Sequence, residues 1–213
     1  MAVKKLSSII GLIALAAGSI GCHSTTPDSG LERGEVLYGA CISCHKADGS
    51  GLEVIGAPSI AGMAPWYVER QLNKFRHGIR GSHHEDVEGM RMRPMSRTLR
   101  HESDVKSVAA YVASLPRIEA DSGLGGDAKA GQALYAVCQT CHGANAEGNI
   151  ALNAPQLRYH DDWYLLNQLK KFKSGVRGSN PQDVTGAQMM PMASTLIDEQ
   201  AMKNVIAYIQ TLK

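Results

Sequence analysis

The segment Cys41-Ile42-Ser43-Cys44-His45 decides the interpretation of this chain, and it recurs as Cys138-Gln139-Thr140-Cys141-His142. The pattern C-x-x-C-H is the attachment sequence for c-type haem. Two thiols bond to the haem, and the adjoining histidine supplies one axial ligand of the iron. In a helix, positions i, i+3 and i+4 share one face, so Cys41, Cys44 and His45 can all approach one porphyrin. Two copies of the motif predict two covalently bound haem c groups.

A paired C-x-x-C segment can also form half of a zinc site or a redox-active dithiol. What favours haem here is a second matched feature, because each motif is followed at the same distance by a Pro-Met pair. These pairs are Pro94-Met95 and Pro191-Met192. A thioether ligand raises the potential of haem iron relative to a second histidine, and the preceding proline stiffens the backbone. We therefore predict Met95 and Met192 as the second axial ligands.

Two further methionines correspond between the copies and compete for the same role. Met92 and Met189 each lie three residues before the predicted ligand. Methionine often fills gaps in cores and loops, and packing is the favoured interpretation for this second pair.

Both motifs lie in a longer repeat whose copies are offset by 97 residues, from position 41 to position 138, without a gap. The matched segments are spread along the whole repeat: Trp66-Tyr67 and Trp163-Tyr164, Gln71-Leu72 and Gln168-Leu169, Lys74-Phe75 and Lys171-Phe172, Arg80-Gly81-Ser82 and Arg177-Gly178-Ser179. The repeat has an ordinary domain length. We predict one domain at 31–116, a Pro- and Gly-containing linker at 117–126, and a second domain at 127–213.

The spacing of apolar residues predicts helices and irregular loops in each copy. In the first copy we expect helices over 32–43, from Pro65, and from about His101. Glycines and a proline predict a loop over 78–95. The expected fold is all-α, with two tandem domains that each pack a few helices around one haem.

Composition limits the class of protein. Hydrophobic residues make up 44% of the chain but aromatic residues only 5%, so a buried macrocycle would help two small domains to complete their cores. The formal net charge of +2 is too small to indicate nucleic acid or another polyanion as a partner.

The N-terminus has the pattern of an export signal. A short basic stretch at 1–5 precedes an apolar stretch at 6–20, which is shorter than the roughly 20 residues that a membrane-spanning helix needs. Four of the five cysteines belong to the haem motifs, and the fifth, Cys22, ends a Ser19-Ile20-Gly21-Cys22 segment. This segment resembles the cleavage box of bacterial lipoproteins but has Ser19 where an aliphatic residue is usual.

We therefore predict a lipoprotein-type signal peptide at 1–21, with an ordinary cleaved signal as the alternative. A polar tether would follow at 22–30. Acyl chains on Cys22 would anchor the exported protein on the periplasmic side of a membrane.

Taken together, the motifs show that the chain resembles the bacterial dihaem class I cytochromes c of the c4 type. The features that carry the resemblance are the paired C-x-x-C-H and Pro-Met segments and the closing helices with Tyr111 and Tyr208. The Trp-Tyr-x-x-x-Gln-Leu and Arg-Gly-Ser segments also resemble cytochrome c domains fused to terminal-oxidase subunits. The resemblance covers about residues 32–213.

This resemblance implies an electron carrier and not an enzyme, with no small-molecule substrate. Its implied partners are redox proteins, such as a quinol-oxidising complex and a terminal oxidase or reductase. The axial pairs would be His45 with Met95 and His142 with Met192. It also implies that a backbone carbonyl at Pro58 and at Pro155 accepts the ring N–H of the axial histidine.

Two alternatives remain open at this point. A dihaem enzyme, such as a peroxidase or a thiosulfate-oxidising cytochrome, would need an open or unusually ligated iron, whereas both copies offer His and Met. A fixed electron-entry subunit of an oxidase complex would suit a lipid anchor.

The copies differ most around the methionines. Copy one carries Arg91, Arg93, Arg97 and Arg100, whose counterparts are uncharged: Gln188, Met190, Ser194 and Ile197. Such a cluster would oppose the ferric form of the first haem and attract an acidic partner, unless it is only a solvated basic surface. The pair His83-His84, replaced by Asn180-Pro181, is favoured as a solvated loop over a metal-binding or pH-sensitive site.

Overall fold

The computed structural model describes residues 29–119 and 123–212, and the regular elements within these ranges are all helical. The all-α prediction is therefore confirmed. The predicted signal peptide at 1–21 and the lipidation site Cys22 lie outside the described residues. We refer to residues 29–119 as copy 1 and to residues 123–212 as copy 2.

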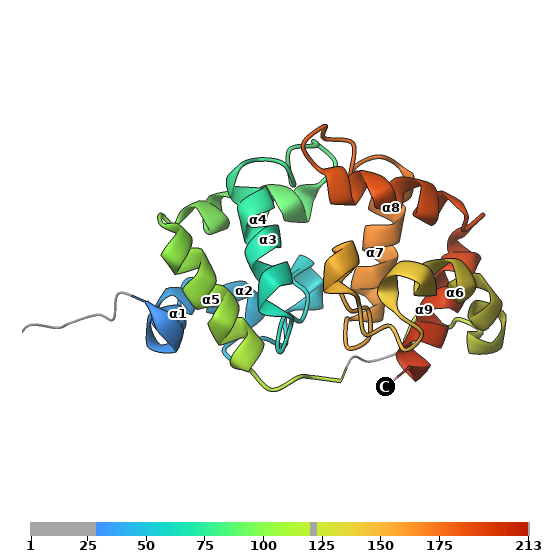
Figure 1. The fold of residues 1–213 in the computed structure, drawn as a ribbon, viewed down its shortest axis with the longest axis horizontal. Coiled ribbons are helices and arrows are strands. Elements are labelled where there is room, and N and C mark those ends of the chain that lie inside the picture. Colours follow the sequence, from blue (N-terminus) through green and yellow to red (C-terminus); the bar gives the residue numbers. More distant parts are fainter. Residues whose placement is uncertain (1–28, 120–122, 213) are drawn as a thin grey trace, which may run out of the picture.

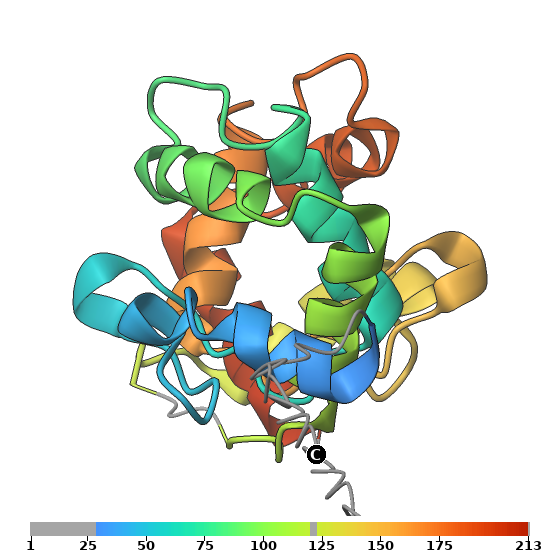
Figure 2. The ribbon, with the colours of Figure 1, turned by 90° about the vertical axis from the view of Figure 1, so that its left-hand side faces the viewer.

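The two copies contain corresponding sets of elements. Copy 1 comprises α1 (Gly30–Tyr38), α2 (Ile42–His45), η1 (Glu53–Ile55), α3 (Pro65–Arg76), α4 (Val87–Arg97) and α5 (Glu102–Ser114). Copy 2 comprises α6 (Ala128–His142), η2 (Ile150–Leu152), α7 (Asp162–Lys173), α8 (Val184–Ser194) and α9 (Glu199–Thr211). Figure 1 shows the copies side by side. In the view along the long axis, α4 and α8 both lie near the top (Figure 2).

The attachment motif begins differently in the two copies. In copy 2 it forms the end of one continuous helix, α6, whereas in copy 1 a turn at residues 39–41 separates α1 from α2. The predicted single helix over 32–43 is therefore wrong for copy 1. Gly39 occupies the position of Ala136, and glycine costs about 1 kcal/mol relative to alanine within a helix, which explains the break.

The predicted loop over 78–95 is correct only as far as residue 86, because α4 begins at Val87 and includes both Pro94 and Met95. The side chain of Asp86 caps this helix by accepting a hydrogen bond from the backbone N–H of Gly89. Asp183 caps α8 in the same way through Gly186. A capping aspartate stabilises a helix start by about 1 kcal/mol, which offsets only part of the roughly 3 kcal/mol that a proline costs inside a helix.

Helix α1 crosses α5 closely in copy 1, and α6 crosses α9 in copy 2. At each crossing a glycine faces a backbone carbonyl: a Cβ at Gly34 would lie 2.1 Å from the oxygen of Ser107, and one at Gly131 would lie 1.9 Å from that of Asn204. Both glycines have ordinary helical dihedrals, so the requirement comes from interhelical distance alone. Val105, Val108 and Val112 of α5 fill the core beside this crossing.

We predict that Gly34→Ala destabilises the protein by about 1–3 kcal/mol, since the added methyl overpacks the crossing of α1 and α5. Urea unfolding of the haem-loaded protein measures this change. Gly123→Ala is the matched control, because a Cβ at Gly123 meets nothing within 4 Å. Equal stability of the two variants would contradict the packing argument.

Two buried tyrosines fix the loops that follow the attachment motifs. The hydroxyl of Tyr38 donates to the carbonyl of Lys46 at 2.9 Å, and that of Tyr135 donates to the carbonyl of Gly143 at 2.7 Å. Each ring packs against a tyrosine of the closing helix, Tyr111 or Tyr208. These contacts make Tyr38 and Tyr135 packing residues that hold the loop against the closing helix.

Candidate functional site

Each copy contains a largely apolar cavity beside its attachment motif. The cavity of copy 1 has a volume of about 360 Å³, and Cys41, Cys44 and His45 line it. The cavity of copy 2 has a volume of about 170 Å³ and is lined by the corresponding residues Cys138, Cys141 and His142. The structure therefore brings each predicted attachment set to one cavity wall.

Both motif histidines are buried and held by the same kind of hydrogen bond. Nδ1 of His45 lies 2.9 Å from the carbonyl oxygen of Pro58, and Nδ1 of His142 lies 2.7 Å from that of Pro155. Burial lowers the pKa of both imidazoles, and the backbone hydrogen bond opposes this shift. A neutral ring that donates Nδ1–H keeps its lone pair on Nε2, the atom available to a metal. The predicted bonds to Pro58 and Pro155 are confirmed.

The first thiol of each motif, Cys41 or Cys138, lacks the lowered pKa of a reactive dithiol. Burial, with a contribution from Cys44, raises the pKa of Cys41 to about 11, and burial also raises that of Cys138. Redox-active cysteines and zinc ligands require the thiolate, which a lowered pKa favours. Within 29–119 and 123–212, no group of three or more His, Cys, Asp and Glu side chains is arranged to hold a metal ion.

Two methionines from one helix reach each cavity. Met92 and Met95 of α4 line the cavity of copy 1, and Met189 and Met192 of α8 line that of copy 2. Since residues three apart lie on the same side of a helix, both members of a pair can approach the cavity. The predicted ligands Met95 and Met192 are the more exposed members, at 37% and 39%.

Each cavity is also lined by a buried arginine. Arg80 lines the cavity of copy 1 and Arg177 that of copy 2, and the Nε atom of each is buried without a hydrogen-bond partner among the described residues. A guanidinium group pairs well with a carboxylate, and haem carries two carboxylates. The thiols, the neutral histidine, the thioethers and these arginines together fit a covalently bound haem at each cavity.

A model of the family described as Cytochrome c matches residues 31–116 and, separately, residues 128–213. The chain belongs to the cytochrome c family. Cytochrome c4 from Thiocapsa roseopersicina is 29% identical over 186 residues, which cover 82% of this chain and 88% of that relative. The crystal structure of reduced recombinant cytochrome c4 from Pseudomonas stutzeri superposes with a TM-score of 0.66 at 26% identity, covering 85% of this chain and 98% of that one.

Other relatives of this cytochrome are named for thiosulfate chemistry. A thiosulfate dehydrogenase electron acceptor from Stutzerimonas stutzeri (strain A1501) is 30% identical over 158 residues, 69% of each chain. The structure of thiosulfate dehydrogenase (TsdBA) from Marichromatium purpuratum matches with a TM-score of 0.67 at 30% identity and 85% coverage. The present chain accounts for only 40% of that longer chain.

The tandem domains and the c4 relatives define the chain as a dihaem c-type cytochrome of the c4 type, an electron-transfer protein with two covalently bound haem c groups. No helix in the described parts of the cytochrome is long and apolar enough to cross a membrane.

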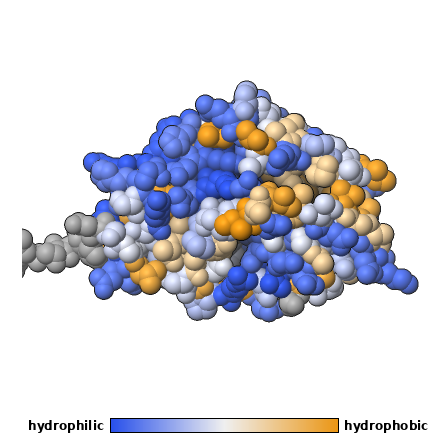
Figure 3. Space-filling model, in the orientation of Figure 1, coloured by the Kyte–Doolittle hydropathy of each residue, from blue (hydrophilic) through white to orange (hydrophobic). Residues whose placement is uncertain are grey.

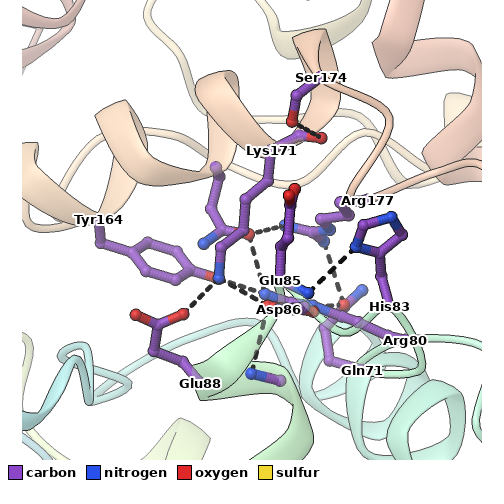
Figure 4. A network of polar contacts seen from close by, with 12 residues as sticks. Gln71, Arg80, His83, Glu85, Asp86, Glu88, Tyr164, Lys171, Ser174 and Arg177 are labelled. Carbon is purple, nitrogen blue, oxygen red and sulfur yellow. Dashed lines mark hydrogen bonds and ion pairs between the residues drawn. The ribbon is translucent and has the colours of Figure 1, made fainter.

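The two halves of the cytochrome meet through a reciprocal set of polar contacts. Lys74 of α3 pairs with Asp183 and donates to Thr185, while Lys171 of α7 pairs with Asp86 and Glu88. Figure 4 shows Lys171 reaching the two carboxylates of the other copy. The two lysines occupy equivalent positions of the repeat, and so do Asp86 and Asp183. Each lysine therefore pairs with the same position of the other copy, which gives the interface approximate twofold symmetry.

The same symmetry organises the arginines beside the cavities. Arg80 donates to Gln71 of its own copy at 2.8 Å and to Gln168 of the other at 3.0 Å. Arg177 donates to Gln168 at 2.7 Å. It also donates to Gln71 at 3.2 Å, and Figure 4 shows Arg177 beside Gln71. None of these residues is among the site residues predicted from the sequence. Their signal was present nonetheless, because all six of the lysine, arginine and glutamine positions are identical between the copies.

We predict that Lys171→Met destabilises the cytochrome by about 3 kcal/mol, since it leaves the buried carboxylate of Asp86 without its cation. Burial opposes the charge on Asp86, but Lys171 and Arg80 outweigh it and hold the pKa below its ordinary value. The stabilisation is therefore complete above the unfolded pKa of about 4 and is lost as the pH falls through the folded value. Urea unfolding at neutral and acidic pH measures both effects. Lys203→Met, which removes a surface ion pair with Glu199, should change the stability far less at either pH.

The arginines around Met95 take different roles in the structure. Arg91 donates to the carbonyl of Ile55 at 2.5 Å, and Arg97 donates to that of Arg76 at 3.2 Å. Arg93 is half-buried, whereas Arg100 is exposed. Hydrophilic side chains cover much of the α4 side of copy 1, and apolar ones are more frequent over copy 2 (Figure 3). His84 is largely exposed and its ring stacks on His83, as the solvated-loop interpretation predicts.

Proposed function

We propose that this cytochrome carries electrons between respiratory-chain components, with both irons ligated by histidine and methionine. The observation that carries the proposal is the repeated pairing, at each cavity, of a buried neutral histidine with methionines from the helix α4 or α8. Two protein ligands leave no open position for a substrate, and a thioether ligand favours a site that exchanges electrons.

In this proposal, Cys41 and Cys44 hold the first haem and Cys138 and Cys141 hold the second. His45 with Met95, and His142 with Met192, are the axial pairs. The bound haem supplies a one-electron couple between ferrous and ferric iron. The protein residues fix the ligands, exclude water and compensate the carboxylates through Arg80 and Arg177.

The proposed organisation is a domain at 31–116, a linker at 117–126 and a domain at 127–213. Part of the linker is held in place, because the backbone N–H groups of Gly123 and Leu124 donate to Asp162 at 2.7 and 3.1 Å. We further propose export through the signal at 1–21 and anchoring on the periplasmic side through lipidated Cys22.

Two kinds of partner are supported by named relatives. The cbb3-type cytochrome c oxidase subunit FixP from Bradyrhizobium is 25% identical over 210 residues, which favours a terminal oxidase as electron acceptor or as a complex that holds this chain. The relatives named as electron acceptors of thiosulfate dehydrogenase favour such an enzyme as the electron donor. In both cases the cytochrome passes electrons and catalyses no reaction of its own.

We predict that the partner of the first domain docks on the basic surface of α4. Replacing Arg91 and Arg93 with glutamine should slow electron transfer to or from an acidic partner about tenfold at low salt, because charge steering contributes 10- to 1000-fold to such rates. Stopped-flow oxidation of the reduced cytochrome by membranes containing its oxidase, across a range of ionic strength, measures this. Electron-transfer rates that change neither with ionic strength nor with the substitutions would contradict docking on this surface. If the membranes do not oxidise the reduced cytochrome, the proposed acceptor is wrong.

A further inference from the structure

One peptide group in copy 1 connects His45 to a carboxylate from copy 2. Its carbonyl, on Pro58, accepts the hydrogen bond from Nδ1 of His45 at 2.9 Å. Its N–H, on Ser59, donates to Oδ2 of Asp161 at 2.7 Å. Ser59 is buried, so water is kept away from this arrangement. The imidazole, the peptide and the carboxylate therefore form one continuous chain of hydrogen bonds between the two halves.

The side chain of Asp161 is committed to this contact and not to its own helix. Asp161 is the N-cap residue of α7, where an aspartate normally accepts a hydrogen bond from the first turn, yet it makes no capping bond. Its carboxylate instead accepts from Ser59, 102 positions earlier in the chain. The distance is typical of a charge-assisted hydrogen bond.

We propose that Asp161 is a positioning residue of the second domain that lowers the reduction potential of the first haem through the Pro58–Ser59 peptide. The proposal rests on the proposed role of His45 as an axial ligand of that haem.

The charge of Asp161 acts on His45 through the chain of hydrogen bonds. A negative charge on the N–H side of a peptide draws electron density onto its carbonyl oxygen, and successive hydrogen bonds polarise one another. A more negative Pro58 oxygen accepts the Nδ1–H of His45 more strongly, and this raises the basicity of the ring as a ligand. A more basic axial ligand stabilises ferric iron and so lowers the potential.

Copy 2 lacks this device. The repeat places Ala64 at the position of Asp161, so the peptide that follows Pro155 has no counterpart of this carboxylate. The reciprocal pairing of Lys74 and Lys171 across the interface shows that equivalent positions face each other there. The histidine-to-proline hydrogen bond is 2.9 Å long in copy 1 and 2.7 Å long in copy 2, and the charge behind the Pro58–Ser59 peptide acts in addition to this difference in length.

The test is a redox titration of the haem-loaded protein. The NMR signals of the haem methyl groups report the oxidation state of each haem separately. We expect Asp161→Asn to raise the potential of the first haem and leave the second unchanged. The expected shift is about tenfold in the ferric-to-ferrous ratio at fixed potential, which corresponds to about 59 mV for a one-electron couple. In the gain-of-function variant, Ala64→Asp should lower the potential of the second haem alone.

Glu53→Gln separates polarisation through the peptide from a general field effect, since Glu53 is an exposed carboxylate that interacts electrostatically with Asp161. Glu53→Gln should raise the reduction potential of the first haem much less than Asp161→Asn does. Unchanged potentials in both Asp161→Asn and Ala64→Asp, with two low-spin haems retained, would overturn the inference and leave the proposed function intact. If the unmodified protein itself does not have histidine and methionine ligands on both irons, the proposed function is overturned instead. If Asp161→Asn does not fold, the Ala64→Asp result alone decides.

Discussion

Replacing Cys41 and Cys44 together with alanine should leave one covalently bound haem per chain where the unmodified cytochrome carries two. The thiols of copy 1 lie on the wall of its own cavity and those of copy 2 on the wall of another, so neither set can substitute for the other. Mass spectrometry of the intact chain and the haem-to-protein ratio measure this change. The C-terminal domain should keep its haem, because α6 and its cavity are built from copy 2 with only a few residues of α3.

The reciprocal variant, with Cys138 and Cys141 changed to alanine, is the matched control and should retain only the first haem. In each variant, the copy that lacks haem should also be less stable, because the residues that line its empty cavity lose their packing contacts with the haem. Retention of two covalent haems by either variant would contradict the assignment of one attachment motif to one haem.

Met95→Leu should remove the thioether-to-iron absorption band of the first haem and convert that iron to a high-spin or differently ligated form. Leucine has a similar volume and no ligand atom, so the helix α4 should remain folded. The potential of the first haem should also fall, because a thioether ligand stabilises ferrous iron. Near-infrared and visible spectra of the oxidised protein, together with a redox titration, measure both changes.

Met92→Leu is the matched control, since Met92 lies on the same helix and lines the same cavity. We expect it to keep the band and to change the potential only slightly. The opposite pattern, with the band lost in Met92→Leu and kept in Met95→Leu, would transfer the ligand role to Met92 and, through the repeat, to Met189.

The features of the site that could be predicted from the sequence are those that involve residues close together in the chain. The C-x-x-C-H spacing dictates that two thiols and an imidazole share one helical face, and the repeat supplies the second site without further argument. The all-α fold follows from the same local periodicity. In contrast, some of the glycines and prolines that predicted a loop lie within helices α4 and α8, which begin at aspartate caps and include Pro94 and Pro191.

The interface between the copies could not be predicted, because it joins positions that are far apart in the chain. The identical lysines, arginines and glutamines of the repeat are equally compatible with two independent surfaces. Only the fold shows that Lys74 pairs with the acidic residue of the other copy and that Gln71 and Gln168 are each shared by Arg80 and Arg177. The role of Asp161 depends on the same arrangement.

The central claim is that both irons carry a histidine and a methionine ligand and serve electron transfer alone. The visible and near-infrared spectrum of the purified oxidised protein, taken with a haem count, tests this claim most directly. We predict two low-spin haems per chain, each with a thioether-to-iron band. A stoichiometric high-spin haem, or a band intensity equal to only one methionine-ligated iron, would contradict the claim and favour a dihaem enzyme.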